Sequence, residues 1–386
     1  MREFDHNLST TTLISVVYPL GPAAIILMPL IVGGVIDQLG FSEQQAGTIA
    51  SLEGLGIVVA SLAAALWIRR VSWTRMLLGG FLAYAALNAI SANIVDFNAL
   101  ATVRFLSGLA GGTVFAIVVA ALGDNNEPDR AFGIGQAMQG VLMFAAFAAA
   151  PFLIESIGVG GLFYMLAATA LVMTTTLVRF PSSGAVRAVT DKTTEGHGNT
   201  GLIWLGMLAG FLYYTSLFGF WGFIERMAQA SEIPATTIGL ALGASQIAAI
   251  LGALAAALAS DRFGRAAPLL IALAGQLIVL WLLIGRFTPL ILYVGAGLYQ
   301  ALYIIATAYQ MGAIAKLDTR GRYLVMITAF QGLGAAVGPS VAAALISNGD
   351  YSGINIAAGL GNIVSIALFV FIIYRSRQVI SRAANV

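Results

Sequence analysis

Charged residues are scarce in this sequence, which contains 19 Lys and Arg and 17 Asp and Glu among 386 residues. They make up 9% of the chain, against roughly 25% in an average soluble domain, so the composition excludes a soluble fold. Apolar residues account for 59% and gather in stretches of about 18 residues or more, the length of a bilayer-spanning helix. The sequence therefore predicts an all-α, polytopic membrane protein.

Cysteine is absent and histidine is nearly so. Without cysteine the chain forms no disulfide, thiol nucleophile or thiolate-ligated metal site. Its two histidines, His6 and His197, lie in polar segments, which excludes a H-E-x-x-H site within the membrane. The G-x-x-x-x-G-K-[ST] signature of nucleotide-binding loops is missing as well. We therefore expect no cofactor, no metal site and no nucleic acid partner.

Twelve apolar segments alternate with short polar connections. They lie near residues 12–36, 45–68, 75–95, 98–122, 131–154, 160–180, 201–225, 236–259, 267–286, 288–315, 322–347 and 354–374. The one longer polar segment, Pro181 to Thr200, is rich in Ser, Thr and Gly and falls at the middle of the chain, as a linker would. The sequence predicts 12 transmembrane helices in two pseudo-symmetric bundles: six over residues 1–180, a linker over 181–200, and six over 201–386.

Basic residues gather on one side of the predicted spans. Of the 19 Lys and Arg, 16 fall in connections on that side, whereas Arg226 and Arg286 fall on the other and Arg104 lies within a span. Because cytoplasmic connections carry the excess of Lys and Arg, we expect both termini and the linker in the cytoplasm, with the bacterial inner membrane as the location. The opposite side carries acidic residues: Asp37, Glu43, Asp96, Glu155, Glu225, Glu232 and Asp350.

The two predicted halves match each other at an offset of 192 residues. At this offset Gly47 aligns with Gly239, and the run Leu-Ala-Ala-Ala-Leu at 62–66 aligns with the same run at 254–258. Arg and Gln-Gly positions align as well: Arg70 with Arg262, Arg130 with Arg322, and Gln139-Gly140 with Gln331-Gly332. An alignment of polar residues at an offset near half the length predicts a duplicated six-helix unit.

The connection at residues 257–265 reads Ala-Leu-Ala-Ser-Asp-Arg-Phe-Gly-Arg. It resembles the G-x-x-x-D-R-x-G-R loop signature of the major facilitator superfamily. A weaker match, Leu100-x-x-x-Arg104-x-x-x-Gly108-x-x-x-Gly112, is similar to the arginine-bearing motif on the family's fourth helix. The resemblance implies the twelve-helix fold and a gating loop in which the aspartate latches the two halves together, near a helix N-terminus. Its residues here would be Asp261, Arg262, Gly264 and Arg265.

This sequence departs from the family pattern at three places. The first glycine of the loop signature is Ala257, and the equivalent connection in the first half has Arg69 in the place of the aspartate. The G-x-x-x-G-P-x-x-G-G pattern of the family's antiporters is missing from the fifth span, and only a partial form, from Gly334 to Ala343, occurs in the eleventh. A latch in the first half and an antiport mechanism therefore receive less support.

Glu53 and Arg104 are the two charges deepest in the predicted spans. Counted from the same membrane face at 1.5 Å per residue, they lie about 13 and 9 Å in, so their depths permit an ion pair. An unpaired charge near a helix centre costs roughly 2.5–3.5 kcal/mol or more. The functional interpretation is a carboxylate that takes up and releases a proton as Arg104 approaches and withdraws. The alternative is a static pair that only fixes helix packing.

Polar and aromatic side chains follow one face of two other predicted helices. Their spacing of three, four and seven residues makes a lipid-facing position improbable, and the resemblance places such helices around a central path. The candidate cavity residues are Tyr214, Phe218, Trp221 and Glu225 in the seventh span, Gln300, Tyr303, Thr307 and Gln310 in the tenth, and Gln139 and Gln331 in the fifth and eleventh. Hydrogen bonding between helices and an aromatic belt at the membrane surface are the alternatives.

The leading hypothesis is a monomeric, proton-coupled secondary transporter that moves a small organic solute across a lipid bilayer by alternating access. Efflux antiport and uptake symport both fit, and a facilitative carrier, a channel or a membrane-embedded enzyme are further alternatives. An enzyme would need paired acids or a nucleophile with its base inside the spans, whereas the spans offer Glu53 and Arg104. We therefore expect no enzymatic activity.

Cysteines introduced singly at Ser183 and Asp350 test the predicted topology. An impermeant maleimide added to intact cells should label Asp350→Cys and spare Ser183→Cys until the cells are permeabilised. Since the chain has no cysteine of its own, each label reports on the introduced site alone. Equal labelling of both variants would contradict the topology.

Overall fold

A computed structural model describes residues 8–183, 200–259, 262, 264, 266–315 and 322–383, and within these ranges the chain is almost entirely helical. The elements are α1 (Leu8–Val17), η1 (Tyr18–Leu20), α2 (Ala23–Ile26), α3 (Met28–Leu39), α4 (Glu43–Trp67), α5 (Trp73–Ser91), α6 (Phe97–Gly123), α7 (Pro128–Ile157), α8 (Gly160–Met173), η2 (Thr174–Val178), α9 (Thr200–Ala230), α10 (Ala235–Ala259), α11 (Ala266–Leu282), α12 (Pro289–Ala315), α13 (Arg322–Ala343) and α14 (Ser352–Ala383). Nine helices in the described ranges are long and apolar enough to cross a membrane. The all-α, polytopic fold is thereby confirmed.

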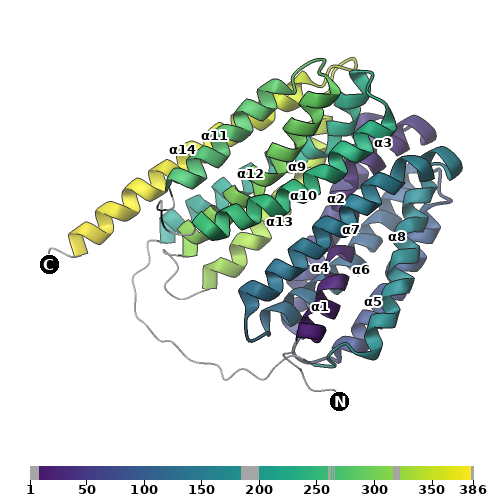
Figure 1. Cartoon of the computed structure of the whole chain (residues 1–386), viewed down its shortest axis with the longest axis horizontal. Coiled ribbons are helices and arrows are strands. Elements are labelled where there is room, and N and C mark those ends of the chain that lie inside the picture. The colour runs from purple at the N-terminus through teal and green to yellow at the C-terminus, as the bar shows by residue number, and fades with distance from the viewer. Residues whose placement is uncertain are drawn as a thin grey trace.

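The helices form two bundles that follow one another along the chain. Figure 1 shows α1 to α8 together in an N-terminal bundle and α9 to α14 together in a C-terminal bundle. We call the end where α3 ends and α4 begins the acidic face, and the end where α4 ends and α5 begins the basic face. In Figure 1 the bundles meet near the acidic face and diverge toward the basic face, where α1 begins.

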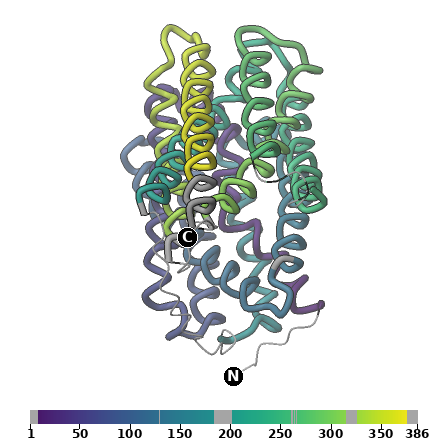
Figure 2. The backbone as a smooth tube through the Cα atoms, turned by 90° about the vertical axis from the view of Figure 1, so that its left-hand side faces the viewer, coloured from purple at the N-terminus to yellow at the C-terminus, as the bar shows by residue number. Residues whose placement is uncertain are grey.

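The first predicted span is a series of short helices instead of one continuous helix. Pro19, Pro22 and Pro29 lie at its breaks, because proline cannot donate the backbone hydrogen bond that a continuous helix requires. The segment passes between the two bundles, with α1 against α7 and α3 against α9. In Figure 2 it is the purple part of the tube between the blue and the green helices.

Local sequence explains where the neighbouring helices begin. Ser42 caps α4 in a reciprocal capping box, in which its hydroxyl accepts from Gln45 N at 3.2 Å and the Gln45 side chain accepts from Ser42 N at 3.0 Å. Asp96 caps α6 by accepting a hydrogen bond from Ala99 N at 2.9 Å. Both caps lie at the acidic face, so they fix the register of the two helices that carry Glu53 and Arg104.

The duplication predicted from the sequence recurs in the helix bounds. The first and last residues of α4 and α10, and those of α6 and α12, are each 192 residues apart. Contacts repeat in the same way. A Cβ at Gly47 would meet Pro339 and Ala343, and one at Gly239 would meet Phe147 and Pro151, each of these again 192 positions from its counterpart. The two bundles therefore pack on each other through two equivalent seams, α4 on α13 and α10 on α7.

At the basic face, Arg69 contacts a residue of its own bundle. Its guanidinium binds both carboxylate oxygens of Asp124, at 2.5 and 2.8 Å, and so joins the end of α4 to the end of α6. These hydrogen bonds raise the pKa of Arg69 further above its ordinary value. This connection, which has Arg69 in the place of the family's aspartate, thus makes an ion pair within the N-terminal bundle. The latch implied by the resemblance would instead join the two bundles.

Candidate functional site

Glu53 and Arg104 form an ion pair inside the N-terminal bundle. Arg104 is fully buried, and its guanidinium donates to both Glu53 oxygens, one at 3.2 Å through Nε. A further nitrogen donates to Asn88 Oδ1 at 2.7 Å and Ser91 Oγ at 3.4 Å. The Phe163 ring lies 4.7 Å from the guanidinium carbon. The side chains around Arg104 therefore replace the water that this charge would otherwise need.

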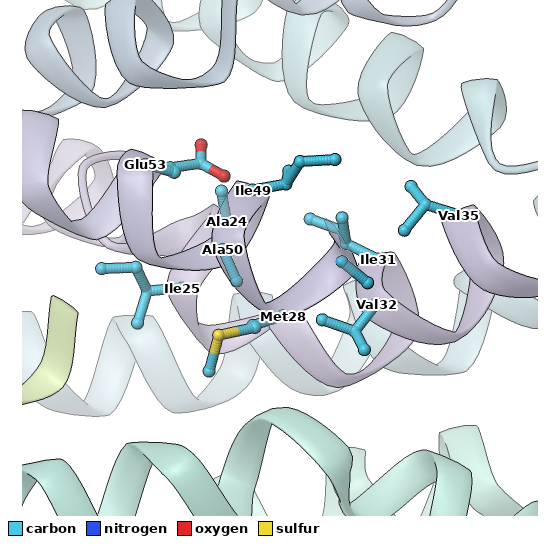
Figure 3. A pocket seen from close by; sticks show the side chains of 10 residues that line it. Ala24, Ile25, Met28, Ile31, Val32, Val35, Ile49, Ala50 and Glu53 are labelled. Carbon is cyan, nitrogen blue, oxygen red and sulfur yellow. The ribbon is translucent and has the colours of Figure 1, made fainter. Parts of the chain in front are cut away.

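The Glu53 carboxylate also borders a narrow cavity of about 10 Å³. Figure 3 shows the carboxylate at one end of a row of apolar side chains from α2, α3 and α4. This volume is close to the roughly 10–15 Å³ that one water molecule requires. A single water beside Glu53 is therefore the largest polar guest that the cavity admits.

A larger cavity of about 170 Å³ lies between the two bundles. Both bundles line it, and five of the ten predicted cavity residues are among the lining. The lining residues are Tyr18, Pro22, Ile25, Ile26, Phe115, Gln136, Gln139, Leu217, Phe218, Trp221, Gln246, Ala249, Tyr299, Gln300, Tyr303 and Ile304. Aromatic rings and glutamine amides predominate, and among the described residues the lining contains no Asp, Glu, Lys or Arg.

Aromatic packing between α9 and α12 builds one wall of this central cavity. Tyr214 stacks on Phe218 with ring centroids 5.9 Å apart, and Tyr303 packs edge-on against both rings, at 5.9 and 6.3 Å. The Tyr214 and Thr307 hydroxyls are 3.1 Å apart. Tyr214 and Thr307 do not line the cavity themselves. Tyr214, bonded to Thr307, packs against Phe218 and Tyr303, and these two rings line the cavity.

The other three predicted cavity residues lie elsewhere. Gln310 and Gln331 are buried in the C-terminal bundle, each with side-chain atoms that have no hydrogen-bond partner. Glu225 lies one turn beyond Trp221, toward the acidic face. Helical spacing placed these residues on the same faces as the lining residues, but it carries no information on where along a helix the cavity ends.

Sequence reasoning missed Tyr18, Phe115, Gln246 and Tyr299 as lining residues. Tyr18 lies directly before Pro19 in the first span. A proline within an apolar span indicates a break in the helix, and this could have pointed to Tyr18. Gln246 is a buried amide in an apolar helix, which could have been noted in the same way as the glutamines of α12. Phe115 and Tyr299 carry no such signal, since aromatic residues also serve as ordinary packing.

A set of contacts that we call the acidic-face seal closes the space between α9 and the α2–α3 segment. The Trp221 indole N–H donates to Ile26 O at 3.0 Å, and its ring packs edge-on against Phe147 with centroids 6.3 Å apart. Further along α9 toward the acidic face, Arg226 binds Asp37 at 2.5 Å, and Gln229 binds the same carboxylate at 3.0 Å. The central cavity is thus closed from the acidic face.

The predicted gating loop is only partly within the described residues. Arg262 and Gly264 are exposed, and Gly264 has a φ of 66°, which suits a glycine in a tight turn. Asp261 and Arg265 lie outside the described residues. Their part in a latch stays a prediction.

Two bundles of membrane-spanning helices around a solute-sized central cavity define a membrane carrier. The chain matches the sequence model of the Major Facilitator Superfamily over residues 12–202 and 206–385, and it belongs to that superfamily. It is therefore a transporter and not an enzyme. No match was found among curated protein sequences.

Several solved structures share the fold. The nucleoside transporter NupG is 16% identical with a TM-score of 0.74, over 95% of this chain and 99% of that one. The xylose transporter XylE from E. coli, in an inward open conformation, is 13% identical with a TM-score of 0.73, over 92% and 95% of the two chains. A bacterial homolog of the human lysosomal transporter Spinster, inward-facing, is 13% identical with a TM-score of 0.67, over 95% and 94%.

Removing one partner of the Glu53–Arg104 pair should destabilise the protein more than removing both. Arg104→Met or Glu53→Leu leaves a buried charge without its partner, which costs about 3–5 kcal/mol of unfolding free energy. The double variant should recover most of that loss, because no buried charge remains. Chemical unfolding of the four proteins in detergent measures this, and additive losses in the double variant would show that the pair is not coupled.

Proposed function

We propose that the protein is a secondary transporter that moves a small, uncharged organic solute by alternating access, driven by a proton gradient. The observation that carries this proposal is the central cavity, which both bundles line and which the acidic-face seal closes at one end. A site shared by two bundles changes its exposure when the bundles rock against each other. We take residues 1–180 and 201–386 as the two moving domains and 181–200 as their linker.

The chemistry of the cavity supports an uncharged solute. Its described lining offers glutamine amides and tyrosine hydroxyls for hydrogen bonds and aromatic rings for stacking, without a charged side chain. Arg104, a potential anion site, is instead held by Glu53, Asn88 and Ser91. The volume of about 170 Å³ is below the roughly 300–1,000 Å³ of pockets for drug-sized ligands. Nucleosides and xylose, the solutes named for two similar structures, are uncharged as well.

The arrangement of the bundles supports a direction for the opening. The basic face carries most of the Lys and Arg, and we propose that it is the cytoplasmic face of a bacterial inner membrane. With the acidic face sealed, the cavity then communicates with the cytoplasm. This is the inward-facing state of an alternating-access cycle.

Proton coupling is proposed for Glu53. Glu53 is only 3% exposed. Its partner Arg104 also binds Asn88 and Ser91, so Arg104 keeps these hydrogen bonds when it separates from Glu53. When Arg104 withdraws, an ionised Glu53 in a dry site becomes costly and binds a proton. The small cavity beside the carboxylate has room for the water that would deliver it.

Ligand binding tests the proposed substrate class. In a thermal-shift screen of nucleosides, monosaccharides and aromatic carboxylates, we expect stabilisation by uncharged members. Gln300→Ala and Gln139→Ala should weaken that binding about 2- to 10-fold, because a hydrogen bond contributes roughly 0.5–1.5 kcal/mol. Thr102→Ala, on an exposed face of α6, is the matched control. Stabilisation by carboxylates alone would refute an uncharged substrate.

Glu53→Gln tests the coupling. The amide keeps the shape and a hydrogen-bond acceptor for Arg104 but cannot ionise, so pH-driven accumulation in proteoliposomes should be lost while solute exchange continues. Glu155→Gln removes an exposed acid at the end of α7 and should accumulate solute as the parent does. A Glu53→Gln variant with unchanged accumulation would remove Glu53 from the mechanism.

A further inference from the structure

Glu225 lies in the middle of the acidic-face seal and has no part in the mechanism proposed above. Along α9, Trp221, Glu225 and Gln229 follow one another at four-residue spacing and so share one face. Trp221 and Gln229 each bind a residue of the N-terminal bundle, Ile26 and Asp37. Glu225 occupies the turn between them.

The Glu225 side chain packs directly on the backbone of the other bundle. A Cβ added at Gly33 of α3 would overlap both carboxylate oxygens. The residue is only 5% exposed, and its Oε2 is buried without a hydrogen-bond partner. A carboxyl group is thus enclosed between α3 and α9 at the surface where the two bundles must part.

The neighbouring cation is engaged with other groups. Arg226 binds Asp37 at 2.5 Å and Gln229 at 2.8 Å, and it approaches the Tyr351 hydroxyl at 3.4 Å. Within the described part of the chain, the ionisable groups around Glu225 are Arg226 on its own helix, Asp37 on α3 and Tyr351 at the start of α14. Asp37 is itself acidic, so α3 adds a negative charge near the carboxyl group.

An ionised carboxylate with a buried, unpartnered oxygen is unfavourable, whereas the protonated form is much less so. When α3 and α9 separate, water reaches the carboxyl group and its ionised form becomes favourable again. The closed seal therefore binds the proton more tightly than the open one. By linkage, protonation favours closure to the same degree, so falling pH closes the acidic face and rising pH opens it.

We propose that Glu225 is a proton-binding site that controls closure of the acidic face. The Trp221 side chain, which binds Ile26 and packs on Phe147, lies between Glu225 and the central cavity, so the proton comes from the medium at the acidic face and returns there. It differs in this from the coupling proton proposed for Glu53. The proposal rests on the alternating access proposed above, because it needs an open state of the same face.

Distances between the bundles test this directly. Ser156 at the end of α7 and Thr236 at the start of α10 are exposed at the acidic face on opposite bundles. Spin labels on cysteines introduced there report closure as a short distance, without background, since the chain has no cysteine. Gly47→Leu, whose side chain would meet Pro339 and Ala343, supplies the open reference.

In the parent, the ratio of long to short distances should rise several-fold from pH 5 to pH 8. The largest possible rise is the factor by which the closed state binds the proton more tightly than the open state. Glu225→Gln should remain short throughout. Glu225→Asp, which still ionises, should respond to pH, and Glu43→Gln, a partly exposed acid of the same face, should behave as the parent.

A pH response that persists in Glu225→Gln would overturn the proposal. If the response persists there but is lost in Asp37→Asn, it belongs to Asp37. Distances independent of pH in the parent would overturn the proposal as well. Solute transport in proteoliposomes separates this outcome from failure of the proposed function. Transport with pH-independent distances rejects the Glu225 site alone, whereas pH-dependent distances without transport reject the transport function and leave the site standing.

Discussion

Close approach of helix backbones at small residues is the constraint on which the rest of this structure depends. Lipid tails are as apolar as leucine, so helices in a membrane associate mainly through packing. A Cβ at Gly108 of α6 would overlap the backbone oxygen of Glu53, and one at Gly56 of α4 would overlap that of Phe105. Glycine at these positions brings α4 and α6 together. It is this proximity that places the Glu53 carboxylate within reach of Arg104.

The duplicated architecture carries different chemistry in its two copies. At the 192-residue offset, Ser245 corresponds to Glu53 and Ala296 to Arg104, and the Ser245 hydroxyl bonds the backbone of its own helix at 2.6 Å. The C-terminal bundle instead supplies the aromatic wall of the central cavity, around Tyr303. The buried Glu53–Arg104 pair thus has no counterpart at the corresponding positions of the C-terminal bundle, which instead contributes much of the cavity wall.

Much of the fold could be predicted because it follows from one-dimensional patterns. Apolar length identified the spans, and the 192-residue offset identified the duplication. The Glu53–Arg104 contact was accessible for a related reason, since depth counted from one face places two charges at similar levels.

The cavity was less accessible to prediction. Helical spacing identified the faces that carry Tyr303 and Trp221, but the extent of the cavity depends on the angle between the bundles, which no local pattern records. Glu225 illustrates this. It continues the Trp221 face by one turn, and only the position of Gly33 on the other bundle places it within the seal and outside the cavity.

The burial of the Glu53–Arg104 ion pair in the N-terminal bundle has an electrical consequence. While Glu53 is ionised, its charge cancels that of Arg104, so a rearrangement with a bound uncharged solute carries no net charge through the N-terminal bundle. A proton on Glu53 leaves the positive charge of Arg104 uncancelled. The protonated carrier then feels the membrane potential, worth about 2.3 kcal/mol per elementary charge per 100 mV for a complete crossing. In the proton-coupled cycle proposed above, voltage would therefore act on the step in which Glu53 carries a proton.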